Sequence, residues 1–113
     1  MNSDELIVNI QCVEHGIVPI GGMPIEHVKS ALSDLDDEAR RKCTRKFRKI
    51  LKKAIKHQAA EYYVPGTTQY KAFVDDYRRR TGINRSGHRF TFTKSERSLR
   101  KGIVVRYLSH IET

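Results

Sequence analysis

The segment from Asp36 to Val64 carries the strongest structural signal in the sequence. Three acidic residues stand in what would be a first helical turn, where the helix dipole favours negative charge. Apolar residues then recur in steps of three and four, namely at Ala39, Cys43, Phe47, Ile50, Leu51, Ala54, Ile55 and Tyr62. This spacing predicts one amphipathic helix of about 27 residues with one face in a hydrophobic core.

The opposite face of this helix is basic without interruption. No Asp or Glu occurs between Ala39 and Ala60. The nine cations that cover the face, here called the basic stripe, are Arg41, Lys42, Arg45, Lys46, Arg48, Lys49, Lys52, Lys53 and Lys56. Like charges four residues apart oppose helix formation, so the six such pairs cost on the order of 1–3 kcal/mol at low salt. We therefore expect an anionic partner that compensates this repulsion.

The first 20 residues predict a short β-hairpin. Residues 5–13 are apolar and β-branched with partial alternation, and His15 and Gly16 interrupt the run before residues 17–20. Pro19 confines the second strand to the edge of a sheet, because proline has no N–H group to donate.

Two shorter helices flank the long one. Apolar residues at helical spacing predict a helix over residues 24–33, which opens on a proline. After the long helix, Thr67 or Thr68 can cap a second helix that runs to Thr81, where Gly82 supplies the stop.

The C-terminal third predicts two more strands and a short helix. Residues 88–93 alternate in polarity and predict a strand. Thr93 and Glu96 match a capping box, which predicts one or two helical turns that end at Gly102. Residues 103–111 are rich in β-branched side chains and predict a final strand.

Together these elements predict a single α+β domain over residues 1–113, with a small antiparallel sheet built from the N- and C-terminal strands. Its charge is divided along the chain. Residues 1–38 contain eight acidic residues and only Lys29, whereas residues 39–113 contain 21 Lys and Arg against five Asp and Glu. We interpret the acidic N-terminal part and the basic helical and strand part as contact surfaces.

A second group of cations lies in and beside the expected loops, which can enter grooves that a rigid helix face cannot. This second cluster comprises Arg78, Arg79, Arg80, Arg85, Arg89, Lys94, Arg97, Arg100 and Lys101. With the basic stripe, it predicts a non-enzymatic nucleic-acid-binding protein that contacts the phosphate backbone as a component of a nucleoprotein assembly. The pattern fits DNA and RNA equally.

Other interpretations fit the same charges. The basic stripe can meet an acidic protein surface or the acidic part of another copy, which describes a structural assembly protein, for example in a virion. An anionic membrane surface fits less well, because the apolar face of the helix is needed for the core. No apolar run approaches the roughly 20 residues of a spanning helix, so no membrane partner is expected.

The sequence gives no sign of an enzyme. The five histidines show no metal-binding spacing, and no glycine-rich phosphate loop or framed nucleophile is present. A metal-dependent nuclease would have to use Asp75 and Asp76, but adjacent acids on a helix face different ways. We expect them to offset the arginines that follow. No catalytic residue, metal or cofactor is therefore expected.

The cysteines and the N-terminal residues indicate the compartment in which we expect the protein. Cys12 and Cys43 are too few and too far apart for a disulfide framework or a zinc site. The acidic N-terminus lacks the basic start and apolar core of a secretory signal. We expect a reducing intracellular compartment, or a place in a virion.

The aromatic residues are expected to serve packing. Tyr62 and Tyr63 end the long helix, and Phe90 and Phe92 share one face of the expected strand. The alternative for the two phenylalanines is an exposed sheet on which nucleic-acid bases stack.

Overall fold

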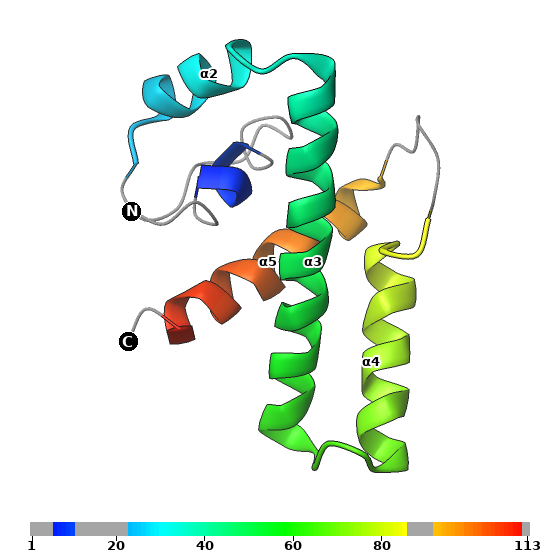
Figure 1. The fold of residues 1–113 in the computed structure, drawn as a ribbon. Coiled ribbons are helices and arrows are strands. Elements are labelled where there is room, and N and C mark those ends of the chain that lie inside the picture. The colour runs from blue at the N-terminus through cyan, green and yellow to red at the C-terminus, as the bar shows by residue number, and fades with distance from the viewer. Residues whose placement is uncertain (1–5, 11–22, 86–91, 112–113) are drawn as a thin grey trace. The chain divides into compact units, whose positions relative to one another are not determined.

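The computed structural model describes residues 6–10, 23–85 and 92–111 (Figure 1). These residues form helices and connecting loops, with no strand among them. Residues 6–10 are helical, and the longer helices are α2 (Ile25–Ser33), α3 (Asp37–Tyr62), α4 (Thr68–Thr81) and α5 (Lys94–Ile111).

The prediction of an α+β fold with an antiparallel sheet is therefore wrong. Residues 6–10, expected in a strand, are helical. Ile7, Val8, Asn9 and Ile10 are all buried in succession, whereas a half-buried strand would bury alternate residues. A short apolar run that is buried on all sides fits a helix and a strand equally well, and β propensity does not decide between them. The expected strand at residues 17–20 lies outside the described residues.

The predicted C-terminal strand is also wrong, because residues 103–111 continue helix α5. The capping box forms as predicted: the Glu96 N–H donates to Thr93 Oγ1 at 3.2 Å, and the Thr93 N–H donates to Glu96 Oε1 at 2.8 Å. The helix then passes through Gly102 and buries Ile103, Val104 and Leu108. Each buried aliphatic side chain contributes about 1.5–3 kcal/mol, which exceeds the cost of roughly 1 kcal/mol for one helical glycine.

The strand expected at residues 88–93 is wrong at Phe92 and Thr93, which are the two residues of this range that the structure describes. Residues 88–91 lie outside the described residues, while Phe92 and Thr93 belong to no strand. Thr93 instead caps helix α5, so its backbone N–H is bonded to Glu96 and is not available to a sheet.

The prediction of one long helix is confirmed by α3, which has 26 residues and extends over roughly 39 Å. Asp36 caps its start, since the Ala39 N–H donates to Asp36 Oδ1 at 2.7 Å. The first predicted helix is confirmed by α2, which begins directly after Pro24.

Both ends predicted for α4 are confirmed. Thr67 Oγ1 accepts a hydrogen bond from the Tyr70 N–H at 3.3 Å. At the other end Gly82 adopts the left-handed conformation with φ of 67°. The Gly82 N–H donates to the Arg79 carbonyl and the Ile83 N–H to the Arg78 carbonyl, which is the hydrogen-bond pattern of a Schellman motif.

The chain forms two compact units, Met1–Ile50 and Leu51–Thr113, here called the first and second unit. The first unit has a core cluster of Ile10, Met23 and Val28. Leu6, Leu32, Leu35 and Cys43 are partly buried against this cluster. Helix α2 and the N-terminal half of α3 thus share an apolar core with residues 6–10. The single domain expected from the sequence stays a prediction.

In the second unit, the C-terminal half of α3 contacts both α4 and α5. Tyr62 and Tyr63 lie against Phe73 of α4, with ring centroids 5.9 Å apart in each pair. Glu61 of α3 pairs with Arg106 of α5 at 2.8 Å. Helices α4 and α5 also contact each other directly. Within the described residues, the second unit thus packs the C-terminal half of α3 with α4 and α5, and eight of the nine cations of the second cluster belong to it.

Candidate nucleic-acid interface

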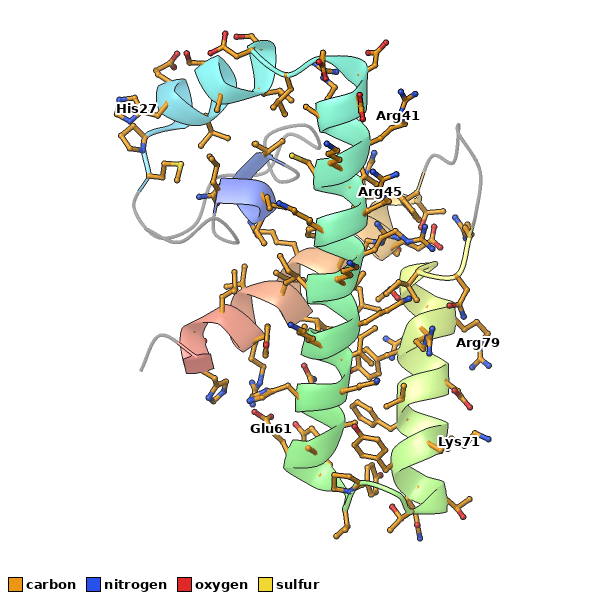
Figure 2. The ribbon with its side chains drawn as sticks, in the orientation of Figure 1. His27, Arg41, Arg45, Glu61, Lys71 and Arg79 are labelled. Atoms are coloured by element: carbon orange, nitrogen blue, oxygen red, sulfur yellow. The ribbon has the colours of Figure 1, made fainter. Side chains whose placement is uncertain are left out.

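The basic stripe lies on the exposed side of α3. Eight of its nine side chains are exposed and Arg48 is half-buried. Arg41 and Arg45 project from the helix (Figure 2). The buried residues of α3 are those predicted from spacing, namely Phe47, Ile50, Leu51, Ala54 and Ile55, together with Ala59. The amphipathic interpretation of α3 is confirmed, except that Tyr62 is exposed.

Little of the charge on the stripe is offset by a neighbouring acid on the same helix. Lys42 Nζ lies 3.9 Å from Glu38 Oε1 across one turn, and both side chains are exposed. Exposed pairs of this kind contribute about 0–1 kcal/mol. The acids of α3 itself therefore offset little of the repulsion between stripe cations four residues apart.

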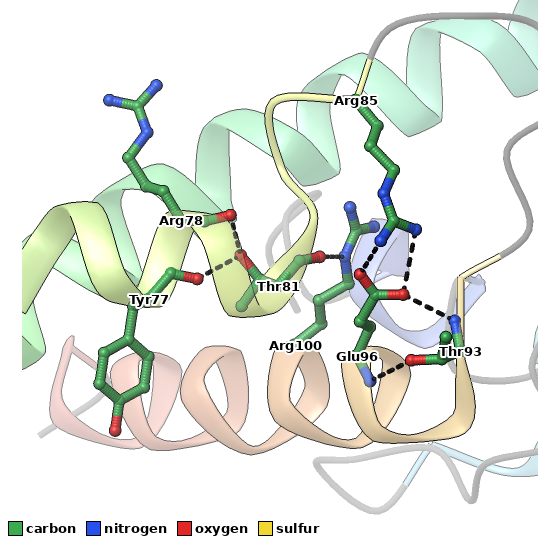
Figure 3. Close-up of polar contacts among 7 residues, drawn as sticks. All are labelled: Tyr77, Arg78, Thr81, Arg85, Thr93, Glu96 and Arg100. Atoms are coloured by element: carbon green, nitrogen blue, oxygen red, sulfur yellow. Dashed lines mark hydrogen bonds and ion pairs between the residues drawn. The ribbon is translucent and has the colours of Figure 1, made fainter.

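Two arginines of the second cluster have structural contacts that join the end of α4, or the loop after it, to α5. Arg85 forms a bidentate ion pair with Glu96, with nitrogen to oxygen distances of 3.0 and 2.5 Å (Figure 3). Arg100 is buried and its Nε–H donates to the Thr81 carbonyl at 2.8 Å. Its guanidinium carbon also lies 3.4 Å from the centroid of the Phe92 ring. These two cations are therefore engaged with the protein itself.

Glu96 stands at the centre of this junction. The hydrogen bond from the Thr93 backbone holds the pKa of Glu96 below its usual value, and the contact with Arg85 lowers the pKa further. Gly82 leaves room for the carboxylate, because a Cβ atom there would lie 2.8 Å from Glu96 Oε2. The ionised Glu96 carboxylate thus lies between the C-terminal end of α4 and the N-terminal end of α5 and contacts Arg85 after α4 and Thr93 before α5.

The arginines at the end of α4 are partly offset, as expected. Asp76 pairs with Arg79 at 2.6 Å and with Arg80 at 3.5 Å, and both arginines stay exposed. Arg78 is half-buried and its Nη2 donates to Asn84 Oδ1 at 3.1 Å. Asp76 is therefore occupied by cations, while Asp75 is exposed.

The remaining members of the second cluster differ in their exposure to solvent. Lys94 is exposed, and Arg97 and Lys101 are half-buried. Arg89 lies outside the described residues. The second cluster is thus divided between cations that join helices and cations that solvent and ligands can reach.

Three shallow hollows in the second unit are each lined by at least two cations. The largest, about 690 Å³, includes Arg80 and Arg106. A hollow of about 570 Å³ includes Lys71 and Arg78, and one of about 410 Å³ includes Arg78, Arg79 and Arg85. Sequence reasoning missed Lys71 and Arg106, which stand apart from the charge runs. Only their place beside other cations in the fold reveals them.

A carboxylate and two histidines join α3 to α5. Glu61 Oε2 accepts a hydrogen bond from Arg106 at 2.8 Å, and Glu61 Oε1 lies 3.3 Å from His110 Nε2. The His57 ring lies beside the His110 and Tyr107 rings, at 5.1 and 5.4 Å between centroids. The hydrogen bond from Arg106 lowers the pKa of Glu61, and the charges of Arg106, His110 and His57 act in the same direction.

An exposed aromatic pair ends α3. Tyr62, Tyr63 and Val64 are 61%, 40% and 69% exposed, and we call these three residues the tyrosine tip. Packing explains the two tyrosines only in part, because each ring rests on Phe73 and still presents much of its surface to solvent. The Pro65-Gly66 turn that follows is the sequence signal that could have placed this pair at the end of a helical hairpin.

The part of the chain that the structure describes contains no group of three or more His, Cys, Asp and Glu side chains placed to hold a metal ion. Among the same residues, no helix has the length and apolar character needed to cross a membrane. No protein-family model, curated protein or solved structure matches the chain. We therefore infer its function from its own residues and their arrangement.

Proposed function

We propose that the protein is a non-enzymatic nucleic-acid-binding protein that contacts the phosphate backbone through the basic stripe. The observation that supports this proposal most is the exposure of eight stripe cations along a helix segment, residues 39–60, that contains no acid. The reachable cations of the second cluster, including Arg79 and Lys94, supply a second contact. The protein then acts as a component of a nucleoprotein assembly.

Phosphate matches the geometry and the energetics of the stripe. From Arg41 to Lys56 the helix rises roughly 22 Å, a length along which a duplex presents several phosphates on each strand. Bound phosphates would replace cation–cation repulsion with attraction and release counterions into solution. Contacts to about six to eight phosphates would give a slope of log K against log salt near −5 to −7 on duplex DNA.

The test compares two double charge reversals that change the net charge equally. K49E/K53E removes two stripe cations, and the control K29E/R40E removes two exposed cations that belong neither to the stripe, nor to the second cluster, nor to the three cation-lined hollows. Fluorescence anisotropy with duplex DNA, single-stranded DNA and RNA at several salt concentrations measures affinity, and circular dichroism checks folding. We expect K49E/K53E to bind at least about tenfold more weakly with a shallower salt slope, and the control to lose much less. Equal affinities for a folded K49E/K53E and the wild type would refute the proposal.

A second candidate is a structural assembly protein in which acidic residues of one copy, or of a partner protein, meet the basic stripe. It is favoured by the exposure of Glu26, Asp34, Asp36, Asp37 and Glu38. This function predicts self-association at low salt without nucleic acid, which added salt and K49E/K53E both weaken. Analytical ultracentrifugation of nuclease-treated protein measures it, and a monomer at low salt would count against the candidate.

A further inference from the structure

The tyrosine tip continues the line of the basic stripe. The Tyr63 N–H donates to the Ala59 carbonyl at 2.9 Å, so the backbone keeps the helical path beyond Tyr62. Tyr63 lies seven residues after Lys56, which is close to two full turns and about 10 Å along the axis. A polyanion that follows Lys52 and Lys56 toward the C-terminal end of α3 therefore arrives at an exposed aromatic ring.

The rings at the tip are supported from below. Phe73 lies under Tyr62 and Tyr63 with interplanar angles of 34° and 58°, and Phe73 is itself stacked on Tyr77 at 4.6 Å. Rings backed in this way lose little additional freedom when a ligand covers them. Tyr62, Tyr63 and Val64 are consecutive and all exposed, so the two supported rings are open to a ligand.

The charges around the tip favour an anionic ligand. Glu61 directly precedes the two tyrosines, but Arg106 and His110 contact its carboxylate from α5. The nearest stripe residues along the helix, Lys52, Lys53 and Lys56, are exposed. An aromatic surface beside cations suits a ligand that combines phosphates with flat rings, and it suits an uncharged apolar partner less well.

We propose that the protein binds single-stranded nucleic acid, whose phosphates lie along Lys52, Lys53 and Lys56 and whose unpaired bases stack on Tyr62 and Tyr63. This inference rests on the proposed function and names its ligand class. In a duplex the base faces are already stacked on one another, so only an unpaired strand can offer them to the tip. Stacking on an aromatic side chain changes affinity by roughly 5- to 150-fold per base.

The test compares two double variants at Tyr62 and Tyr63. Y62A/Y63A removes both rings, and Y62F/Y63F keeps both rings without their hydroxyl groups. The probes are a single-stranded oligothymidylate, a duplex of the same length, and an abasic single strand that carries phosphates but no bases. We expect Y62A/Y63A to bind the single strand about tenfold or more weakly, with unchanged affinity for the duplex and the abasic strand. Y62F/Y63F should bind all three probes as the wild type does.

Tyrosine fluorescence gives an independent readout in the wild type, because the chain contains no tryptophan. Stacking should quench the emission on addition of the single strand, and Y62F/Y63F should lose this quenching while it keeps its affinity. If Y62A/Y63A lost affinity for the duplex and the single strand equally, or for neither, the stacking proposal would be overturned. If K49E/K53E still weakens binding in that case, phosphate contact by the stripe stands alone. No binding of any probe by the wild type would overturn both proposals.

Discussion

Glu61 is a single residue on which contacts from another helix converge. Arg106 and His110 of α5 both contact its carboxylate, and its pKa is lowered chiefly by the hydrogen bond from Arg106. Because the folded state holds the proton less readily than the unfolded state, ionised Glu61 contributes stability above the usual carboxyl pKa. That contribution is lost as the pH falls through the lowered pKa of the folded state.

We therefore expect E61Q to have a lower melting temperature than the wild type at pH 7. The difference should shrink toward zero as the pH is lowered below the usual carboxyl range, where the wild-type side chain is also protonated. Thermal melts followed by circular dichroism from pH 7 to pH 3 measure this. E26Q, which changes an exposed carboxylate on α2, is the matched control. A difference between E61Q and the wild type that stays constant with pH would contradict the expectation.

At the residue scale, local signals could be predicted from the sequence and distant partners could not. The Thr93–Glu96 capping box and the Gly82 stop depend on neighbours within a few residues, and both formed as expected. The partner of Arg85 is 11 residues away and that of Arg100 is 19 residues away. Since no pattern in the sequence assigns those partners, both arginines were grouped with the cations expected to bind phosphate.

At the scale of the elements, Gly102 is the residue that most clearly separates a helix from a strand. It lies inside α5, is exposed, and has open space around the position of an added Cβ. Replacing a helical glycine with alanine at such a position reduces the entropy lost on folding. We expect G102A to raise the free energy of unfolding by roughly 0.5–1 kcal/mol.

Urea denaturation followed by circular dichroism measures this change, and G82A is the matched control. Gly82 has a positive φ, and its added Cβ would lie within 3.3 Å of Glu96, Phe92 and Arg85. The same substitution should therefore destabilise the protein at Gly82 and stabilise it at Gly102. A loss of stability in G102A would contradict a continuous helix α5.

Most elements that the sequence predicted correctly have long periodic patterns and capping residues at their ends. Helices α3 and α4 have both features, whereas α2 has nine residues and begins after Pro24 without a side-chain capping hydrogen bond. The strands were predicted from short apolar runs. When every residue of such a run is buried, the period of 2 of a strand cannot be told from the period of 3.6 of a helix. The sequence prediction ended a short helix at Gly102 and began a strand after it, whereas α5 continues through Gly102 and buries Ile103, Val104 and Leu108.

At the scale of the whole molecule, the net charge is unevenly shared between the two units. Met1–Ile50 contains eight Lys and Arg and eight Asp and Glu, whereas Leu51–Thr113 contains 14 Lys and Arg against five Asp and Glu. The second unit therefore carries the whole excess of +9. Repulsion among like charges in a compact unit reduces its stability, and dissolved salt screens that repulsion.

We expect the melting temperature of the wild type to rise between about 20 mM and 500 mM sodium chloride, over which the Debye length falls severalfold. K49E/K53E places acids among the stripe cations, so its melting temperature should rise less over the same range. Melts at matched protein concentration, without nucleic acid, give the comparison. A wild-type melting temperature that falls with salt would contradict this account.

The basic stripe could be predicted because all nine residues lie on one helix, whose faces follow from spacing alone. The place of the tyrosine tip at the end of a helical hairpin could be predicted from the Pro65-Gly66 turn. The exposure of Tyr62 and Tyr63 could not, because it depends on how α4 packs against the end of α3. Likewise, the hollow that contains Arg80 and Arg106 combines residues of α3, α4 and α5 that are far apart in the sequence.

The boundary between the two units falls inside α3, between the buried residues Ile50 and Leu51. Modular proteins usually join compact units through an exposed segment that tolerates cutting and insertion. A truncation or recombination event at this boundary would instead divide one continuous helix between two buried neighbours, Ile50 and Leu51. Exchange of one unit by recombination at this boundary would therefore interrupt α3, whereas substitutions on the surface can alter binding and leave the helix continuous.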